Sequence, residues 1–252
     1  MNAIAMTDSA QMRALLAFLM GLAAAFGNVL GGYFVVRRDW SRQYLRYFLA
    51  LGAGFMLATA LVEMIPESLR LAGERALYFV LIGYFLVHFF EHTLAPHFHF
   101  GEETHPEEMA RQHASYTALL GLMIHAFFDG VAIAAGFLVS NWLGLVIFVA
   151  VLLHKLPEGF TVASLFLASG QSRQKALLAA GLLGLATLLG VFLTSLLHTH
   201  LSYALPLAAG VSLYVAASDL VPEVNRERAP GMAVVVFLGV AILLVLHRFV
   251  RI

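Results

Sequence analysis

Two short stretches of the sequence, HAFFDG at residues 125–130 and HKLPEG at residues 154–159, follow one pattern. Each begins with a histidine and ends with a carboxylate followed by a glycine, and three residues separate the histidine from the carboxylate. On an α-helix this spacing places both side chains on the same face, about 6 Å apart. Both stretches lie within long apolar segments, where ionisable side chains are rare and usually functional. The pattern therefore predicts a functional site in apolar surroundings.

The composition predicts a membrane protein. The chain has 252 residues, of which 61% are hydrophobic and 12% charged, and its mean hydropathy is +0.85. Soluble domains carry about 25% charged residues. Apolar runs of about 20 residues, long enough to cross a lipid bilayer, recur along the whole sequence. We therefore expect an all-α integral membrane protein.

Charge and cysteine content exclude several functions. The formal net charge is zero, which argues against a nucleic-acid partner. The chain has no cysteine, so disulfides and thiolate metal sites are excluded. The N-terminal residues lack the basic region and cleavage site of a signal peptide, so we expect the first span to be retained.

Eight spans are predicted, in a single transmembrane domain over residues 1–252. Their expected ranges are 13–36, 47–66, 76–95, 115–139, 143–168, 176–197, 203–224 and 231–249. The connections are short, for example SNW at 140–142, except for the polar, histidine-bearing stretch 96–114. Loops on the side of that stretch carry nine Lys and Arg residues against five on the other side. Because basic residues favour the cytoplasmic side, we expect both termini outside the cytoplasm, in a cell (inner) membrane.

One segment of the chain is repeated. AGFMLATALVEMIPE at 53–67 aligns without gaps on AGVSLYVAASDLVPE at 209–223, which places Glu63 opposite Asp219. Spans two and seven are then counterparts. Each successive span crosses the membrane in the reverse direction, and span seven comes five spans after span two, so the two run in opposite directions. We expect a 3+2+3 inverted-repeat arrangement with spans four and five central, as in many transporters. The alternative is that small-residue and Pro-Glu patterns recur by chance in membrane helices.

Counting along the chain places the two opening motifs at matching depth. Spans four and five are antiparallel neighbours, and we place the turn between them at the centre of residues 141–142. Asp129 and His154 are each 12.5 residues from that centre, and His125 and Glu158 are each 16.5 residues from it. Equal counts mean equal depth in antiparallel helices. We therefore expect two levels, each with one histidine and one carboxylate, near the middle of the membrane.

These four side chains suit a divalent cation. Two carboxylates at bilayer depth are costly unless their charge is neutralised. Two nitrogen and two oxygen ligands fit tetrahedral Zn²⁺, while Fe²⁺, Mn²⁺, Co²⁺ and Cd²⁺ are chemically possible. Pro157 removes a helix hydrogen bond and leaves the Leu153 carbonyl free beside the site. The alternative is that each histidine–carboxylate pair is a hydrogen bond within one helix.

At these residues the chain resembles the ZIP family of metal transporters (Zrt/Irt-like proteins). HAFFDG is similar to the HNxPEG or HNFxDG motif of that family's fourth span, and HKLPEG to the HxxPEG motif of its fifth span. GFMLATALVEMIPES at 54–68 is similar to the second span. The resemblance implies uptake of divalent metal into the cytoplasm without ATP, by elevator-type movement and often as a homodimer. It makes the metal a substrate and not a cofactor, and it assigns the same four ligands.

The chain departs from the family where some members hold a second metal ion. Ala126 replaces the asparagine of HNxPEG, Lys155 replaces the polar residue after the fifth-span histidine, and LATLLG offers Thr187 in place of a glutamate. A lysine ammonium is a compact positive charge on a flexible stem. We expect Lys155 to reach Glu158 or Asp129 and to replace the second metal ion. The alternative is that it extends outward to water.

Other polar residues suggest a path for the metal ion. His88, Glu91 and His92 near the end of span three are candidates to receive metal that leaves the site. Glu63 and Asp219 each lie three residues before a proline. They either line the path of the metal ion or form hydrogen bonds with backbone groups at a helix kink.

Histidines outside the spans have weaker roles. For the histidines of the stretch 96–114 there are two interpretations: they tune transport, or they belong to a solvated loop. For His198 and His200 the two interpretations are that they collect metal outside the membrane, or that they simply lie in a turn.

Two other classes of function compete with transport. An intramembrane zinc hydrolase needs an open metal position for water and a general base, whereas four ligands close this site. A haem-binding electron carrier would use His125 and His154 as axial ligands, but these lie one helical turn apart in depth. We therefore predict a transporter and not an enzyme.

Overall fold

The computed structural model describes residues 2–37, 42–94, 112–197, 200–225 and 230–250, and these residues are almost entirely helical, without a strand. Eight helices or helix chains in this part are long and apolar enough to cross a membrane. This confirms the predicted all-α, eight-span architecture. Six spans are built on α1 (Asn2–Arg37), α4 (Arg75–Phe89), α6 (Gln112–Val139), α7 (Asn141–Ala168), α8 (Arg173–Leu196) and α11 (Pro230–Val250).

Spans two and seven each join two α-helices through a π-helical segment. Span two comprises α2 (Arg42–Thr59), η1 (Ala60–Met64) and α3 (Ile65–Ala72), and span seven comprises α9 (Leu201–Tyr214), η4 (Val215–Leu220) and α10 (Val221–Asn225). A third π-helical segment, η2 (Phe90–Leu94), ends span three after α4.

The π-helical segments of spans two and seven have the same local cause. A proline follows each segment, and its missing N–H and bulky ring disturb the hydrogen bonds of the preceding turn. The Ile65 N–H donates to the Ala60 carbonyl, and the Val221 N–H donates to the Ala216 carbonyl, five residues back in both cases. These positions are aligned in the sequence repeat, so the two counterparts also share their local geometry.

Span two is longer than the sequence analysis predicted. We expected it to end at residue 66, but the helix continues to Ala72. Proline is tolerated at the first turn of a helix, and here Pro66 begins α3. Two polar side chains of α3 are paired with each other, since Arg70 Nε donates to both carboxylate oxygens of Glu67 at 2.9 Å.

The turn between spans four and five is shorter than the expected three residues. Ser140 alone separates α6 from α7, and its side chain accepts a hydrogen bond from the Leu143 N–H at 3.1 Å. This N-cap satisfies one of the unpaired N–H groups at the helix start. Asn141 and Trp142, which we placed in the connection, therefore belong to α7.

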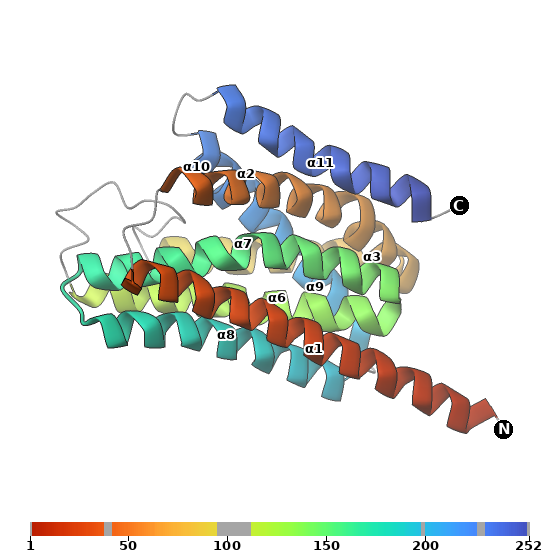
Figure 1. Cartoon of the computed structure of the whole chain (residues 1–252). Coiled ribbons are helices and arrows are strands. Elements are labelled where there is room, and N and C mark those ends of the chain that lie inside the picture. Colours follow the sequence, from red (N-terminus) through yellow and green to blue (C-terminus); the bar gives the residue numbers. More distant parts are fainter. Residues whose placement is uncertain (1, 38–41, 95–111, 198–199, 226–229, 251–252) are drawn as a thin grey trace.

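The helices pack in two groups. Figure 1 shows α1 lying across α6, α7 and α8, and these four helices pack against one another; we call them the site bundle. The other helices form the flanking group, in which α11 lies along α2, and α4 packs against α9. The two groups meet where α7 contacts α2 and where α6 contacts α9. The start of α1 and the end of α11 lie at the same end of the molecule, as an even number of spans requires.

The glycines that end the two opening motifs allow helices to pack backbone to backbone. A Cβ atom on Gly130 would collide with the Thr187 carbonyl of α8, and one on Gly159 would collide with the Asn28 carbonyl of α1. Small residues at such crossings are the usual way in which membrane helices approach closely. The two glycines therefore hold α6 and α7 within the site bundle.

Candidate metal centre

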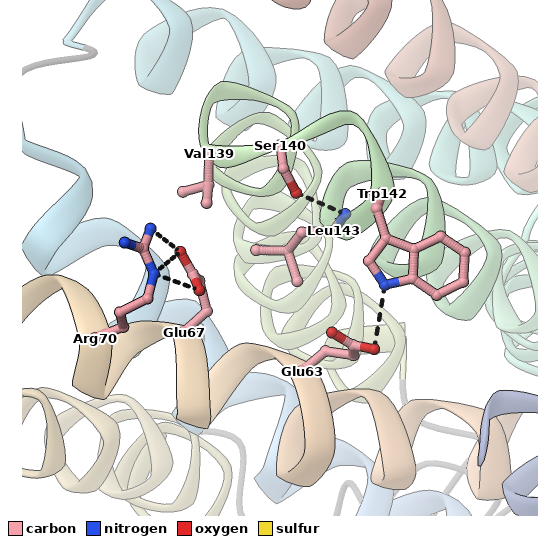
Figure 2. Close-up of a pocket in the computed structure, with 7 residues that line it drawn as sticks. All are labelled: Glu63, Glu67, Arg70, Val139, Ser140, Trp142 and Leu143. Carbon is pink, nitrogen blue, oxygen red and sulfur yellow. Dashed lines mark hydrogen bonds and ion pairs between the residues drawn. The ribbon is translucent and has the colours of Figure 1, made fainter. Parts of the chain in front are cut away.

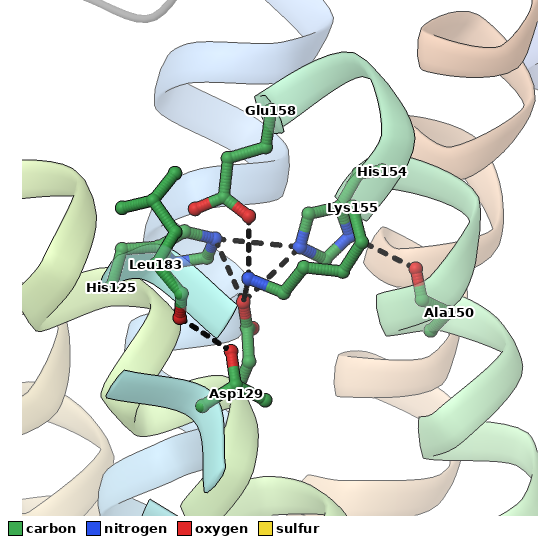
Figure 3. Close-up of polar contacts among 8 residues, drawn as sticks. His125, Asp129, Ala150, His154, Lys155, Glu158 and Leu183 are labelled. Atoms are coloured by element: carbon green, nitrogen blue, oxygen red, sulfur yellow. Dashed lines mark hydrogen bonds and ion pairs between the residues drawn. The ribbon is translucent and has the colours of Figure 1, made fainter. Parts of the chain in front are cut away.

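The four residues of the opening motifs meet at the contact of α6 and α7. His125 and Asp129 come from α6, His154 and Glu158 come from α7, and all four are buried. One potential ligand atom from each lies within 4.8 Å of all the others. The Asp129 Oδ2 atom is 3.1 Å from His125 Nε2 and 3.2 Å from His154 Nε2 (Figure 3). The two histidine Nε2 atoms are 3.4 Å apart.

The surroundings of His154 determine which of its nitrogens carries the proton. Its Nδ1 lies 3.0 Å from the Ala150 carbonyl oxygen, which can only accept a hydrogen bond, so Nδ1 is the donor. In the neutral ring the lone pair is then on Nε2, which faces Asp129. A backbone carbonyl that fixes the outer nitrogen in this way is the usual support of a metal-binding histidine.

Several polar atoms of the group have no hydrogen-bond partner. These buried atoms are His125 Nδ1, Asp129 Oδ1 and Glu158 Oε1. Buried polar atoms are normally paired, so an unpaired cluster signals a missing partner. Since two of the three are carboxylate oxygens, the partner that fits them is a cation.

Lys155 lies within the same group. Its ammonium nitrogen is 2.7 Å from Asp129 Oδ2 and 2.5 Å from Glu158 Oε2, and the residue is completely buried (Figure 3). The sequence analysis expected contact with one of the two carboxylates, and the lysine contacts both. Its burial excludes the alternative that the side chain extends outward to water.

Asn28 of α1 is a site residue that the sequence analysis missed. With its nitrogen facing these atoms, the buried amide donates to Glu158 Oε2 at 3.1 Å and to the Lys155 carbonyl at 2.6 Å. An asparagine in the middle of an apolar span was the available signal. By contrast, Thr187, the residue in place of a family glutamate, donates within its own helix to the Leu183 carbonyl at 3.2 Å.

Glu63 lies apart from this group, at the boundary between the site bundle and the flanking group. Its Oε1 atom accepts a hydrogen bond from Trp142 Nε1 at 3.2 Å and is 2.5 Å from His247 Nδ1. The adjoining cavity has a volume of about 240 Å³, and Figure 2 shows the residues that line it. Its lining residues are Glu63, Glu67, Arg70, Val139, Ser140, Trp142 and Leu143. Trp142 and His247 were not identified from the sequence, because nothing local connects them to Glu63.

The remaining path candidates lie on spans three and seven. Tyr214 donates to Glu91 Oε2 at 2.9 Å, and the rings of His88 and His92 are 4.2 Å apart. Asp219 is buried in η4, and its Oδ1 atom has no hydrogen-bond partner. None of these residues belongs to the four-residue group.

Most of the histidines outside the spans cannot be placed relative to the site. His97, His99, His105 and His198 lie outside the described residues, as does the His113 side chain, and His200 is exposed just before α9.

Fold and site together define a class: a polytopic membrane protein with a buried set of nitrogen and oxygen ligands able to hold a metal ion. The family model described as ZIP Zinc transporter matches residues 11–117 and 100–247. The chain therefore belongs to the ZIP Zinc transporter family.

Individual relatives agree with the family model. The chain is 30% identical over 245 residues to Zinc transporter ZupT of Enterobacter sp. (strain 638), covering 87% of this chain and 90% of that protein. It is 27% identical over 257 residues to Zinc transporter ZIP9-B of Xenopus laevis, covering 82% of this chain and 84% of that protein. Family membership confirms a transporter rather than an enzyme, with zinc as the family's substrate and not a cofactor. It gives no support to the zinc hydrolase.

Proposed function

We propose that the chain carries divalent transition-metal ions, Zn²⁺ foremost, across the membrane into the cytoplasm through a single buried site. The ligands are His125, Asp129, His154 and Glu158. The observation that carries this proposal is the convergence of one ligand atom from each of these buried residues within 4.8 Å. The Nε2 lone pair of His154 faces a carboxylate oxygen at 3.2 Å, an arrangement that a bridging cation makes favourable.

The ligand set favours zinc without excluding other ions. Two imidazoles and two carboxylates neutralise a divalent ion completely and suit tetrahedral geometry. Fe²⁺, Mn²⁺, Co²⁺ and Cd²⁺ accept the same ligands. Four protein ligands leave no position for a reactive water, which suits a transported ion better than a catalytic one.

The site holds one ion per protomer, with Lys155 in place of a second. Its ammonium already bridges Asp129 and Glu158 at 2.7 and 2.5 Å, where a second cation would need the same carboxylates. The residues at the other family positions, Ala126 and Thr187, offer no strong metal ligand.

The site moves as a unit in an elevator-type cycle. The four ligands, Lys155 and Asn28 all belong to the site bundle, which can shift against the flanking group without disturbing the site. The expected inverted repeat supports such a cycle, since spans two and seven run in opposite directions (Figure 1). Each of them also has a π-helical segment before a proline. Glu63 lies on the outer part of the path, whereas Asp219 lies on the inner part.

The orientation and the inner path follow from the sequence. Both termini face outward from the cell (inner) membrane, by the distribution of Lys and Arg. His88, Glu91 and His92 then lie at the cytoplasmic end of span three, where they receive the released ion. The stretch 96–114 lies in the cytoplasm and tunes transport without being essential. The protein is a homodimer, as the family resemblance implies.

Uptake of radioactive Zn²⁺ into proteoliposomes tests the proposal. His154→Ala and Glu158→Ala should each abolish most uptake at limiting Zn²⁺, because each removes one of four ligands. Glu74→Ala, at an exposed position before α4, is the control and should transport normally. Wild-type uptake in both ligand variants would refute the site. Competition with Mn²⁺, Fe²⁺ and Cd²⁺ then establishes the selectivity.

A further inference from the structure

We propose that Lys155 is the internal counter-cation of the transport cycle, which allows the empty site to return across the membrane after the ion is released. The inference rests on the proposed function, because only a site that moves without its ion needs such a charge. It assigns Lys155 a role in the rate of net transport rather than in ligation.

The contacts of Lys155 support this role. The ammonium lies between two carboxylates that we assign as ligands, 2.7 Å from Asp129 and 2.5 Å from Glu158, and it is fully buried. Asn28 donates to the Lys155 carbonyl and to Glu158, so the lysine backbone and its ion-pair partner are held from α1. These contacts fix the lysine inside the site.

The charges of the site explain what the lysine changes. The two carboxylates carry two negative charges, and an empty site without other charges would have to cross the apolar part of the membrane with both of them. The ammonium lowers this to a single negative charge. With a divalent ion bound, the same ammonium leaves a single positive charge instead of none. Lys155 thus makes the return of the empty site easier and the movement of the loaded site slightly harder.

The ammonium also competes with the arriving ion. Asp129 Oδ2 faces both histidine Nε2 atoms and the Lys155 nitrogen, so ion and ammonium share one oxygen. Repulsion between the two cations weakens binding and promotes release on the far side. A transporter benefits from such moderate affinity, because an ion that is held too tightly does not leave.

Net uptake and exchange separate these effects in proteoliposomes. Net uptake into ion-free vesicles requires the empty site to return, whereas exchange of external radioactive Zn²⁺ for internal Zn²⁺ requires only movement of the loaded site. In Lys155→Met we expect net uptake to fall about tenfold, whereas exchange should fall much less, so that the ratio of net uptake to exchange drops. The affinity of the purified protein for Zn²⁺, measured by calorimetry, should rise about tenfold.

Two further variants identify the charge as the cause. Lys155→Arg keeps the charge and should retain a higher ratio of net uptake to exchange than Lys155→Met. Lys175→Met, at the only other lysine of the chain, changes an exposed residue hydrogen-bonded to Gln171 and should leave the ratio unchanged. If Lys155→Met does not reach the membrane, Lys155→Gln replaces it, since an amide still donates to the carboxylates without a charge.

Three outcomes would overturn the inference. Equal loss of net uptake and exchange, or weaker Zn²⁺ binding, in Lys155→Met would mean that the lysine only holds the ligands in place. Wild-type rates of both net uptake and exchange in Lys155→Met would mean that its charge does not affect the return step. Lack of uptake by the wild-type protein would instead refute the proposed function, so the two failures are distinguishable.

Discussion

His154 and Asp129 face each other across the contact of α7 and α6, with Nε2 and Oδ2 3.2 Å apart. His154 Nδ1 donates to the Ala150 carbonyl (Figure 3), so in the neutral ring the Nε2 lone pair points at the Asp129 carboxylate oxygen. Two acceptors in this arrangement repel unless a cation joins them. A metal ion bound between them would remove this repulsion, next to the Lys155 ammonium that already contacts Asp129 Oδ2 at 2.7 Å.

Asp129→Asn tests this arrangement without changing the volume of the side chain. The amide supplies an N–H group that donates to His154 Nε2 and removes the lone pair that an ion needs. We expect the affinity for Zn²⁺ to fall by roughly 100-fold or more, beyond the range for residues that only support metal ligands. Calorimetry on the purified protein measures this. An affinity within a few-fold of the wild type would show that the ion binds elsewhere.

Asn28→Ala tests the support that α1 gives to the site. The amide donates to Glu158 Oε2, and its loss frees that carboxylate to rotate and leaves it partly unsatisfied. We expect Zn²⁺ affinity to fall roughly 10-fold, as is usual for residues that orient metal ligands. Asn141→Ala, at the exposed start of α7, is the matched control and should bind normally. Equal effects of both variants would contradict the assignment of Asn28.

The sequence was sufficient to predict the parts of the site that depend on local spacing. A histidine and a carboxylate four residues apart lie on one face of any α-helix, so the two motifs needed only antiparallel packing of α6 and α7 to meet. The predicted turn was wrong in length, since only Ser140 separates the helices. The four side chains still converge, since one potential ligand atom from each lies within 4.8 Å of the others.

The parts that could not be predicted depend on contacts between distant segments. Asn28 reaches Glu158 only because a glycine at 159 lets α1 approach α7 closely. Similarly, Glu63 meets Trp142 and His247 only after three spans have packed together. The prolines of spans two and seven were visible in the sequence, but they did not specify π-helical segments.

Trp142→Phe tests whether the hydrogen bond to Glu63 holds the two helix groups together. The phenyl ring keeps most of the packing but removes the indole N–H, which donates across the boundary at 3.2 Å (Figure 2). Hydrogen bonds to charged groups contribute roughly 1.5–3 kcal/mol, so we expect the boundary between the two helix groups to open about 10- to 100-fold more often. A cysteine introduced at Val139, which lines the adjoining cavity, should react correspondingly faster with a maleimide.

The introduced cysteine is the only cysteine that the maleimide can label, because the chain has no native cysteine. His247→Ala is the comparison variant: His247 also contacts Glu63, but both belong to the flanking group, so its loss should leave labelling nearly unchanged. Faster labelling in both variants to the same extent would show that Glu63 stabilises the region generally and does not link the two groups.

Gly130→Ala and Gly159→Ala test the close packing that positions the two motifs. The added methyl group would collide with the Thr187 carbonyl in the first case and with the Asn28 carbonyl in the second, and backbone atoms cannot move away as flexible side chains do. We expect each variant to lose about 1–3 kcal/mol of stability, with a lower unfolding temperature in detergent.

Gly181→Ala in α8 is the control, because a Cβ atom there has no neighbour within 4 Å. Since glycine is a poor helix former, that variant should be unchanged or up to about 1 kcal/mol more stable. Equal stability of all three variants would mean that the motif glycines are not required for helix packing.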